Sequence, residues 1–207
     1  MSDFLYYLTT FVEAVASVFG LRFAYEQPHY TVIQNLGPDV EVRQYDPRLA
    51  IEATVAGSDR DKATSEAFTL LFRYITGANQ RDEKIAMTAP VRTDTQRIAM
   101  TAPVQTEVKP DQVSMRFFLP VAVAKAGAPE PTDPHLHLIE VPAATIAAIR
   151  FSGSVTQDKR DHQAAVLYGV LAKSQWRPDG AIFQFSYDPP FTIPFLRRNE
   201  VAVAVQR

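Results

Sequence analysis

The chain has 207 residues, of which 46% are hydrophobic and 21% are charged, with a formal net charge of −2 and a pI near 6.1. This composition supplies enough apolar material for a sizeable core, and it argues against the clustered basic surface that nucleic-acid binding requires. Because the chain contains no cysteine, disulfides, thiolate metal sites and cysteine nucleophiles are excluded.

An amphipathic helix is predicted at residues 3–19, ahead of the main domain, because apolar residues recur there at the helical period. The segment is marginal in length for a membrane span and contains Glu13. The acidic start of the chain also lacks the basic residues of a secretory signal. We expect this helix to dock on its own domain or on a second subunit, with membrane contact through residues 3–19 as the alternative. The expected division is residues 1–28 for helix and linker, and residues 29–207 for one domain.

Beyond residue 28 the pattern alternates between period two and the helical period, which predicts an α+β fold. The expected strands include residues 30–36, 39–45, 49–55, 113–119, 181–187 and 200–205. The expected helices span residues 61–76 and 157–174. The short segment at residues 46–48 predicts a hairpin between the second and third strands.

The chain also resembles itself at an offset of 96 residues, with residues 40–58 set against residues 136–154. Apolar residues match at the start of both segments, a Gly-Ser pair matches at the end, and a polar helix start follows each. The pattern predicts a duplicated unit of strand, strand, helix, strand, strand. Two such units predict two helices lying on a curved antiparallel sheet or barrel.

A doubled octet lies between the two matching segments. KIAMTAPV at residues 84–91 returns as RIAMTAPV at residues 97–104, with seven of eight positions identical. Its alternating residues suit a strand that ends at an edge or bulge near each proline, and the polar residues 92–96 predict a hairpin loop. The octet contains no acid, histidine or cysteine, so we expect it to be scaffold without ligand chemistry.

Several motifs carry a resemblance to one known family. They are EVRQY at 41–45, YITGAN at 74–79, the octet, YDPP at 187–190 and RRNEV at 197–201. From about residue 30 to residue 205 the chain thereby resembles the SOUL haem-binding protein family. The resemblance implies a pseudo-twofold α+β fold, in which a distorted antiparallel β-barrel is flanked by two helices. It also implies binding of haem or a related tetrapyrrole in an apolar cleft.

The resemblance also bears on iron coordination. Some family members carry a histidine at the position of Gln44, where it can serve as an iron ligand. Glutamine is a poor haem ligand, so the resemblance implies haem bound without axial coordination from this position.

The first predicted helix carries more apolar surface than it needs to cover one face of a sheet. Its core stripe consists of Ala63, Ala67, Leu70, Leu71 and Tyr74. A second stripe of Phe68, Phe72 and Ile75 predicts an apolar wall for a flat ligand, and Arg73 is near enough to pair with a propionate. The alternative is that the N-terminal helix or a loop covers these rings.

The second predicted helix repeats the arrangement. Its core stripe is Ala164, Leu167, Tyr168 and Leu171, and another stripe is lined by His162, Val166 and Val170. His162 is a candidate because imidazole is a common haem ligand, and a solvated histidine is the alternative. His135 and His137 share one side of a strand but have no evident third partner, so no metal site is predicted.

The leading hypothesis is a non-enzymatic cytoplasmic protein that binds haem or a related tetrapyrrole as a carrier, buffer or sensor. One alternative is an enzyme acting on a tetrapyrrole or another flat hydrophobic molecule in the same cleft. Another is a protein-interaction module that uses residues 3–19, and membrane association is the alternative to a cytoplasmic location. No catalytic residue is assigned, because the sequence has no glycine-rich phosphate loop, no G-x-S-x-G and no carboxylate pair of defined spacing. The sequence predicts no particular oligomeric state.

Overall fold

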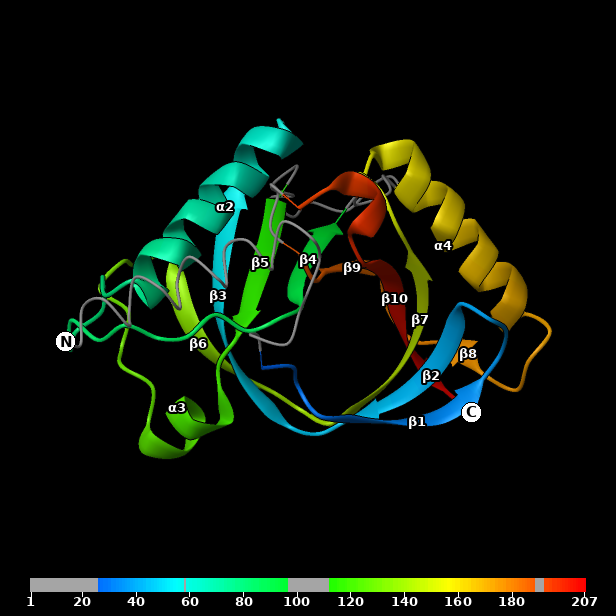
Figure 1. Cartoon of the computed structure of the whole chain (residues 1–207), viewed down its shortest axis with the longest axis horizontal. Coiled ribbons are helices and arrows are strands. Elements are labelled where there is room, and N and C mark those ends of the chain that lie inside the picture. The colour runs from blue at the N-terminus through cyan, green and yellow to red at the C-terminus, as the bar shows by residue number, and fades with distance from the viewer. Residues whose placement is uncertain (1–25, 58, 97–111, 189–191) are drawn as a thin grey trace, which may run out of the picture. The chain divides into compact units, whose positions relative to one another are not determined.

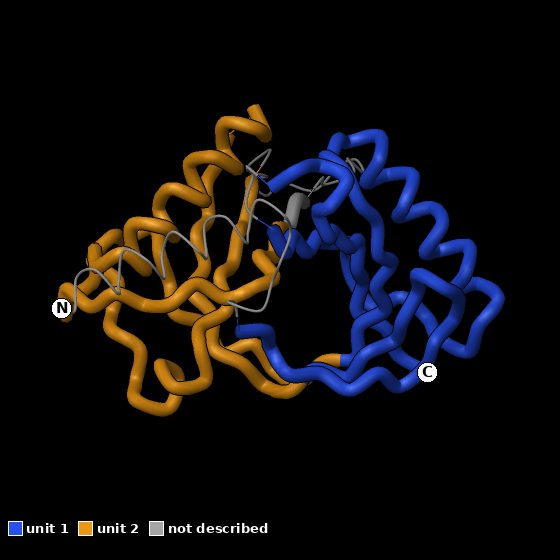
Figure 2. The backbone as a smooth tube through the Cα atoms, viewed as in Figure 1, with its two compact units in different colours: residues 1–45, 145–207 blue, residues 46–144 orange. Residues whose placement is uncertain are grey.

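The structure is a computed structural model that describes residues 26–57, 59–96, 112–188 and 192–207. The chain divides into two compact units (Figure 1, Figure 2). Unit 1 combines Met1–Tyr45 with Thr145–Arg207, and unit 2 is Asp46–Ala144. The helix predicted at residues 3–19 and the second octet at residues 97–104 lie outside the described residues.

Unit 2 is an antiparallel sheet in the order β4-β5-β3-β6, with helix α2 packed on it (Figure 1). Its elements are β3 (Arg48–Ala56), α2 (Arg60–Ile75), β4 (Val91–Gln96), β5 (Gln112–Phe118), α3 (Val121–Ala126) and β6 (Leu136–Val141). Asp59 caps α2, because its carboxylate accepts from the Lys62 N–H at 3.1 Å. Gly77, at φ +119°, takes the chain out of the helix with a backbone that suits glycine.

Unit 1 is an antiparallel sheet in the order β1-β2-β7-β10-β9, with helix α4 packed on it and the short β8 paired to β10. Its elements are β1 (Tyr30–Asn35), β2 (Val40–Tyr45), β7 (Ala144–Phe151), α4 (Gln157–Leu171), β8 (Arg177–Pro178), β9 (Phe183–Ser186), the 3₁₀ helix η1 (Pro194–Leu196) and β10 (Asn199–Gln206). Leu167 and Leu171 of α4 are buried with Trp176 and with valines of β2 and β10. That contact covers one face of the sheet.

The predicted duplication is confirmed, and the structure adds an exchange of strands. The offset of 96 residues places β2 on β6, β3 on β7 and α2 on α4 to within a residue. The order β4-β5-β3-β6 in unit 2 therefore corresponds to β9-β10-β7-β2 in unit 1. Each unit thus takes its fourth strand from the other repeat. The α+β class and the two sheet-covering helices are as predicted.

The hairpin predicted at residues 46–48 is wrong. β3 is paired on both edges within unit 2, by β5 and by β6, so it has no edge left for β2. The residues between β2 and β3 instead lead the chain from unit 1 into unit 2. A short loop between two alternating segments is typical of a hairpin, but the exchange of strands overrides it.

The strand predicted within the first octet is also wrong, as is the loop after it. Residues 84–90 have no strand conformation, and β4 begins at Val91 and runs through the residues predicted as a loop. Ile85 is buried and its N–H donates to the Ile75 carbonyl at 2.8 Å, while Thr88 donates its hydroxyl to the Phe118 carbonyl. Within this octet Ile85, Thr88, Ala89 and Pro90 are therefore buried along an irregular segment, whereas Ala86 is exposed.

Candidate functional site

Helix α2 carries a pair of phenylalanines that the core does not fully cover. Phe68 is half-buried with its ring edge-on to Phe117, at 5.6 Å between centroids. Phe72 lies on Phe68 at 6.0 Å with only 13° between the ring planes, and it remains 45% exposed. The buried stripe of the helix faces the sheet instead. The stacked pair thus leaves aromatic surface exposed to solvent, mainly that of Phe72.

The other two residues predicted for this wall lie differently. Ile75 is 5% exposed and belongs to the core of unit 2, so it is not part of an accessible surface. Arg73 is exposed. Because successive helical residues are about 100° apart, Arg73 projects away from Phe68 and toward the flank that faces β6. It is adjacent to Phe72 along the helix but lines a separate pocket.

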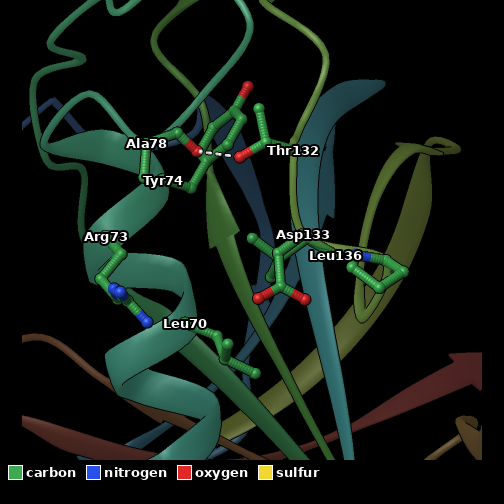
Figure 3. A pocket seen from close by; sticks show the side chains of 8 residues that line it. Leu70, Arg73, Tyr74, Ala78, Thr132, Asp133 and Leu136 are labelled. Carbon is green, nitrogen blue, oxygen red and sulfur yellow. Dashed lines mark hydrogen bonds between the residues drawn. The ribbon is translucent and has the colours of Figure 1, made fainter.

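That pocket lies between α2 and β6 and has a volume of about 240 Å³ (Figure 3). Its lining is Leu70, Arg73, Tyr74, Ala78, Thr132, Asp133, Pro134 and Leu136. Sites that enclose drug-sized ligands usually measure about 300–1,000 Å³. This pocket is too small to enclose a tetrapyrrole, so a macrocycle on this helix would lie on the exposed rings.

The residues predicted on α4 lie in unit 1. His162 is exposed, Val166 is 39% exposed, and Val170 is half-buried against the core. Tyr168, predicted as a core residue, is 40% exposed. That prediction is wrong because Leu167 and Leu171 suffice to contact the sheet.

The duplication allows the two helices to be compared position by position. At the offset of 96 residues, Phe72 corresponds to the exposed Tyr168, while Phe68 corresponds to Ala164. The residue of α4 that corresponds to Arg73 is Gly169. Only α2 therefore combines a ring pair with a neighbouring cation at these positions.

The turn after α2 is fixed by one buried amide. The Asn79 side chain donates to the carbonyls of Tyr74 and Glu83, at 3.1 and 2.7 Å, and accepts from two backbone N–H groups. The Tyr74 hydroxyl donates to the Pro129 carbonyl at 2.7 Å, and burial raises the pKa of Tyr74 to about 12. These bonds tie the end of α2 to two loops and hold one wall of the pocket in place.

A buried charged cluster in unit 1 escaped the sequence analysis. Glu200 is fully buried and accepts two hydrogen bonds from Arg43, at 2.7 and 3.0 Å. It also accepts two from Arg198, at 3.0 and 2.6 Å, and one from Tyr187 at 2.9 Å. The guanidinium carbons of Arg43 and Arg198 lie 4.7 and 4.1 Å from the ring centres of Tyr30 and Tyr187. The ion pairs of Glu200 therefore lie in the interior of unit 1 and not on its surface.

The electrostatics of this cluster favour the charged forms. Burial alone raises the pKa of Glu200, but the hydrogen bond and charge of Arg43, followed by those of Arg198, outweigh it and hold the pKa below its ordinary value. Burial lowers the pKa of Arg43, and Glu200 more than reverses that effect. A sequence signal existed, because Arg43 and Glu200 each adjoin a valine in a segment that is predicted to be a strand. Such a charge in a buried strand requires a partner.

Metal-ligand chemistry is sparse. His135 and His137 are exposed, and the Nδ1 atom of His135 lies 2.9 Å from an Asp133 carboxylate oxygen. Across the described part of the chain, no three His, Cys, Asp or Glu side chains gather as a metal site would need. The Gln44 amide is engaged at both ends, since Thr145 donates to its oxygen at 2.7 Å and its nitrogen reaches the Tyr45 carbonyl at 3.4 Å. In the same described ranges, no helix has the length and apolar character to cross a membrane.

Comparison with known proteins places these features in a family context. A family model described as "SOUL heme-binding protein" matches residues 25–204. Heme-binding protein 2 of Homo sapiens is 25% identical over 193 residues, which cover 89% of this chain and 87% of that protein. Heme-binding protein 1 of Xenopus tropicalis is 28% identical over 165 residues, covering 80% and 83%. These relatives are named for binding and not for catalysis.

Solved structures with the same fold include the EcmrR C-terminal domain. It has a TM-score of 0.57 at 9% identity, covering 86% of this chain and 98% of that chain. A hydrolase from Listeria innocua has a TM-score of 0.51, also at 9% identity, covering 81% and 92%. At this identity the likeness concerns the fold alone.

Proposed function

The chain belongs to the SOUL haem-binding protein family, and we propose that it binds haem or a related tetrapyrrole on the exposed ring pair of α2. In this proposal the protein is a carrier, buffer or sensor and performs no catalysis. The relatives' names support the ligand. The observation that carries the site is the near-parallel stack of Phe68 and Phe72, with Phe72 45% exposed.

The physical basis is burial of flat apolar surface. An aromatic side chain offers roughly 200 Å², so 45% exposure of Phe72 leaves about 90 Å² for a ligand to cover. At about 25 cal/mol per Å² this corresponds to about 2 kcal/mol from one ring. Offset aromatic stacking adds to it.

The residues present fit a porphyrin at its faces and its edge. The ring pair suits the apolar face, and the exposed Arg73 guanidinium suits a propionate, since arginine pairs bidentately with carboxylates. Gln44 is already hydrogen-bonded at both ends, which supports binding without an axial ligand from that position. Bound haem would supply an iron centre, and the chain's own residues would bind and orient it.

Helix α4 supports the assignment by contrast. It has the exposed Tyr168 but alanine and glycine where α2 has Phe68 and Arg73. The exposed His162, with Val166 and Val170 beside it, remains in the proposal as a candidate contact for iron or for the ligand edge.

A haem titration of the full chain tests the proposal. We expect a saturable shift of the Soret band that weakens in Phe72→Ala and stays near the wild-type affinity in Tyr168→Ala, the exposed aromatic on the corresponding helix. A folded wild-type protein that gives no saturable shift would overturn haem binding itself. Equal loss in both variants would remove the α2 site. Replacing His162 by alanine tests coordination, because an unmoved Soret maximum excludes it as the iron ligand.

A further inference from the structure

We propose that the pocket between α2 and β6 is a second ligand site, which takes a small molecule bearing one carboxylate and one protonated amine. The pocket lies on the opposite flank of α2 from the ring pair, and the inference goes beyond haem binding. Two charged side chains of opposite sign line it, Arg73 from the helix and Asp133 from the loop before β6 (Figure 3).

The two charges face the same space without satisfying each other. In the part of the chain that the structure describes, no hydrogen bond or ion pair holds the Arg73 guanidinium. Asp133 accepts two bonds at one oxygen, from the N–H and the Nδ1 of His135, both at 2.9 Å. Its second oxygen has no described partner. The hydrogen bonds from His135 lower the pKa of Asp133, with a smaller effect from the charge of Arg73, so the carboxylate is an anion at neutral pH.

The walls between these charges are apolar and held in place. Leu136 is 3% exposed and Tyr74 is fully buried, and Leu70 packs against the core of unit 2. Thr132 donates its hydroxyl to the Ala78 carbonyl at 3.2 Å, which joins the loop to the end of α2 (Figure 3). A rigid pocket loses little conformational entropy when a ligand enters.

The chemistry of the lining selects the ligand. A free guanidinium binds a carboxylate through two parallel hydrogen bonds, and an ammonium suits a carboxylate oxygen that still has a lone pair to offer. A short methylene chain between these groups would cover the leucines. At about 240 Å³ the pocket has room for a molecule of amino-acid size. The predicted class is therefore a small amino acid whose amine and carboxylate are separated by methylenes.

The test uses three probes of graded length, namely glycine, 4-aminobutanoate and 6-aminohexanoate, with hexanoate and hexylamine as single-charge controls. Amide chemical shifts of the full chain are followed by two-dimensional NMR. We expect saturable shifts at residues 70–78 and 132–136 for a longer amino acid, with a dissociation constant on the order of 1 mM. Each single-charge control should bind about tenfold more weakly.

Variants then assign the contacts. Asp133→Asn keeps an acceptor for His135 and should weaken the amino acid about tenfold, as should Arg73→Gln. Asp158→Asn, an exposed acid on α4, should leave the affinity unchanged. Absence of shifts at roughly ten times the expected dissociation constant would overturn the proposal, and so would hexanoate binding as tightly as the amino acid. Arg73 enters both proposals and Asp133 enters only this one, so Asp133→Asn distinguishes them: it should weaken the amino acid and leave the haem titration unchanged.

Discussion

Replacing Glu200 by glutamine should destabilise unit 1 far more than an ordinary charge removal in a strand. Glu200 is fully buried and accepts five hydrogen bonds, two each from Arg43 and Arg198 and one from Tyr187. Glutamine keeps the shape but turns an amide donor toward the guanidinium groups. Both cations then lose their contacts with the Glu200 carboxylate. Arg43, which is only 2% exposed, keeps only its pairing with Glu41 among these carboxylates, with 2.7 Å between its Nε and a Glu41 oxygen.

The expected loss follows from this burial. Breaking a buried ion pair by removing one partner costs about 3–5 kcal/mol, and domains unfold with about 5–15 kcal/mol in total. Glu52→Gln is the matched control, because Glu52 is also a strand residue paired to an arginine, Arg116. Their side chains retain 18% and 22% exposure, so the control should cost about 1 kcal/mol.

Urea unfolding followed by far-UV circular dichroism measures the difference, because the helices and strands of both units contribute to that signal. The fluorescence of Trp176, the chain's single tryptophan, which is 4% exposed in the core of unit 1, reports in parallel on the unit that contains the cluster. If Glu200→Gln shifts the midpoint no more than Glu52→Gln does, the cluster does not stabilise the unit in the way argued.

The pH dependence provides an independent check. The pKa of Glu200 lies below its ordinary value of 4.5, since Arg43 and Arg198 outweigh the effect of burial. A lowered pKa means that the folded state binds the proton less readily than the unfolded state. The stabilisation is therefore fully present above that ordinary value and is lost as the pH falls through the lowered pKa. The wild-type advantage over Glu200→Gln should shrink in acid, and an advantage that grows in acid would contradict the reasoning.

Three further predictions concern the helices. Phe72→Ala should weaken haem binding at least about fivefold and at most about 30-fold, the limit set by burial of its exposed surface, whereas Tyr168→Ala should change it less than about twofold. Asn79→Ala should lower the free energy of unfolding by about 2–3 kcal/mol, measured by circular dichroism in urea, because several buried backbone groups lose a partner. Leu71→Ala and Leu167→Ala, both at fully buried and corresponding positions, should each cost about 2–5 kcal/mol in the same assay. A cost below about 1 kcal/mol in either would refute its assignment to a core.

Local sequence patterns were sufficient to predict the two long helices. The apolar period, the Asp59 cap and Gly77 set the limits of α2 in the sequence as they do in the structure. The duplication was also visible, because burial of a sheet face requires apolar residues at the same places in both repeats. The stripe of Phe68 and Phe72 could be found since a helix on a sheet needs only one apolar face.

Local sequence patterns could not predict which strands pair with each other. β2 and β3 are close in sequence, yet β2 pairs with β1 and β3 pairs with β5 and β6. Alternation indicates that a strand has one buried face but not which neighbour it joins. The prediction of a strand in the first octet failed for a related reason. An irregular segment that buries Ile85 and Thr88 produces the same apolar pattern as a strand.

The motifs that carry the family resemblance describe scaffold more than ligand contact. EVRQY and RRNEV supply Arg43 and Glu200 to the buried cluster, and YITGAN supplies Asn79 to the turn after α2. The first octet contributes Ile85 to the core of unit 2. Each of these residues is buried and connects helices, strands or turns of its unit.

The residues proposed to contact haem fall between those motifs. Phe68, Phe72 and Arg73 precede YITGAN on α2, and they are the partly covered or exposed members of that helix. Exposed positions can change without disturbing a core, so two chains can share every motif and still differ in ligand. The motifs therefore establish the fold and the family, while the affinity for a tetrapyrrole depends on the few side chains that the scaffold leaves facing solvent. Exchanging Phe68 and Arg73 for the alanine and glycine at the corresponding α4 positions should weaken haem binding more than Phe72→Ala does, while a wild-type far-UV circular dichroism spectrum would show that unit 2 remains folded.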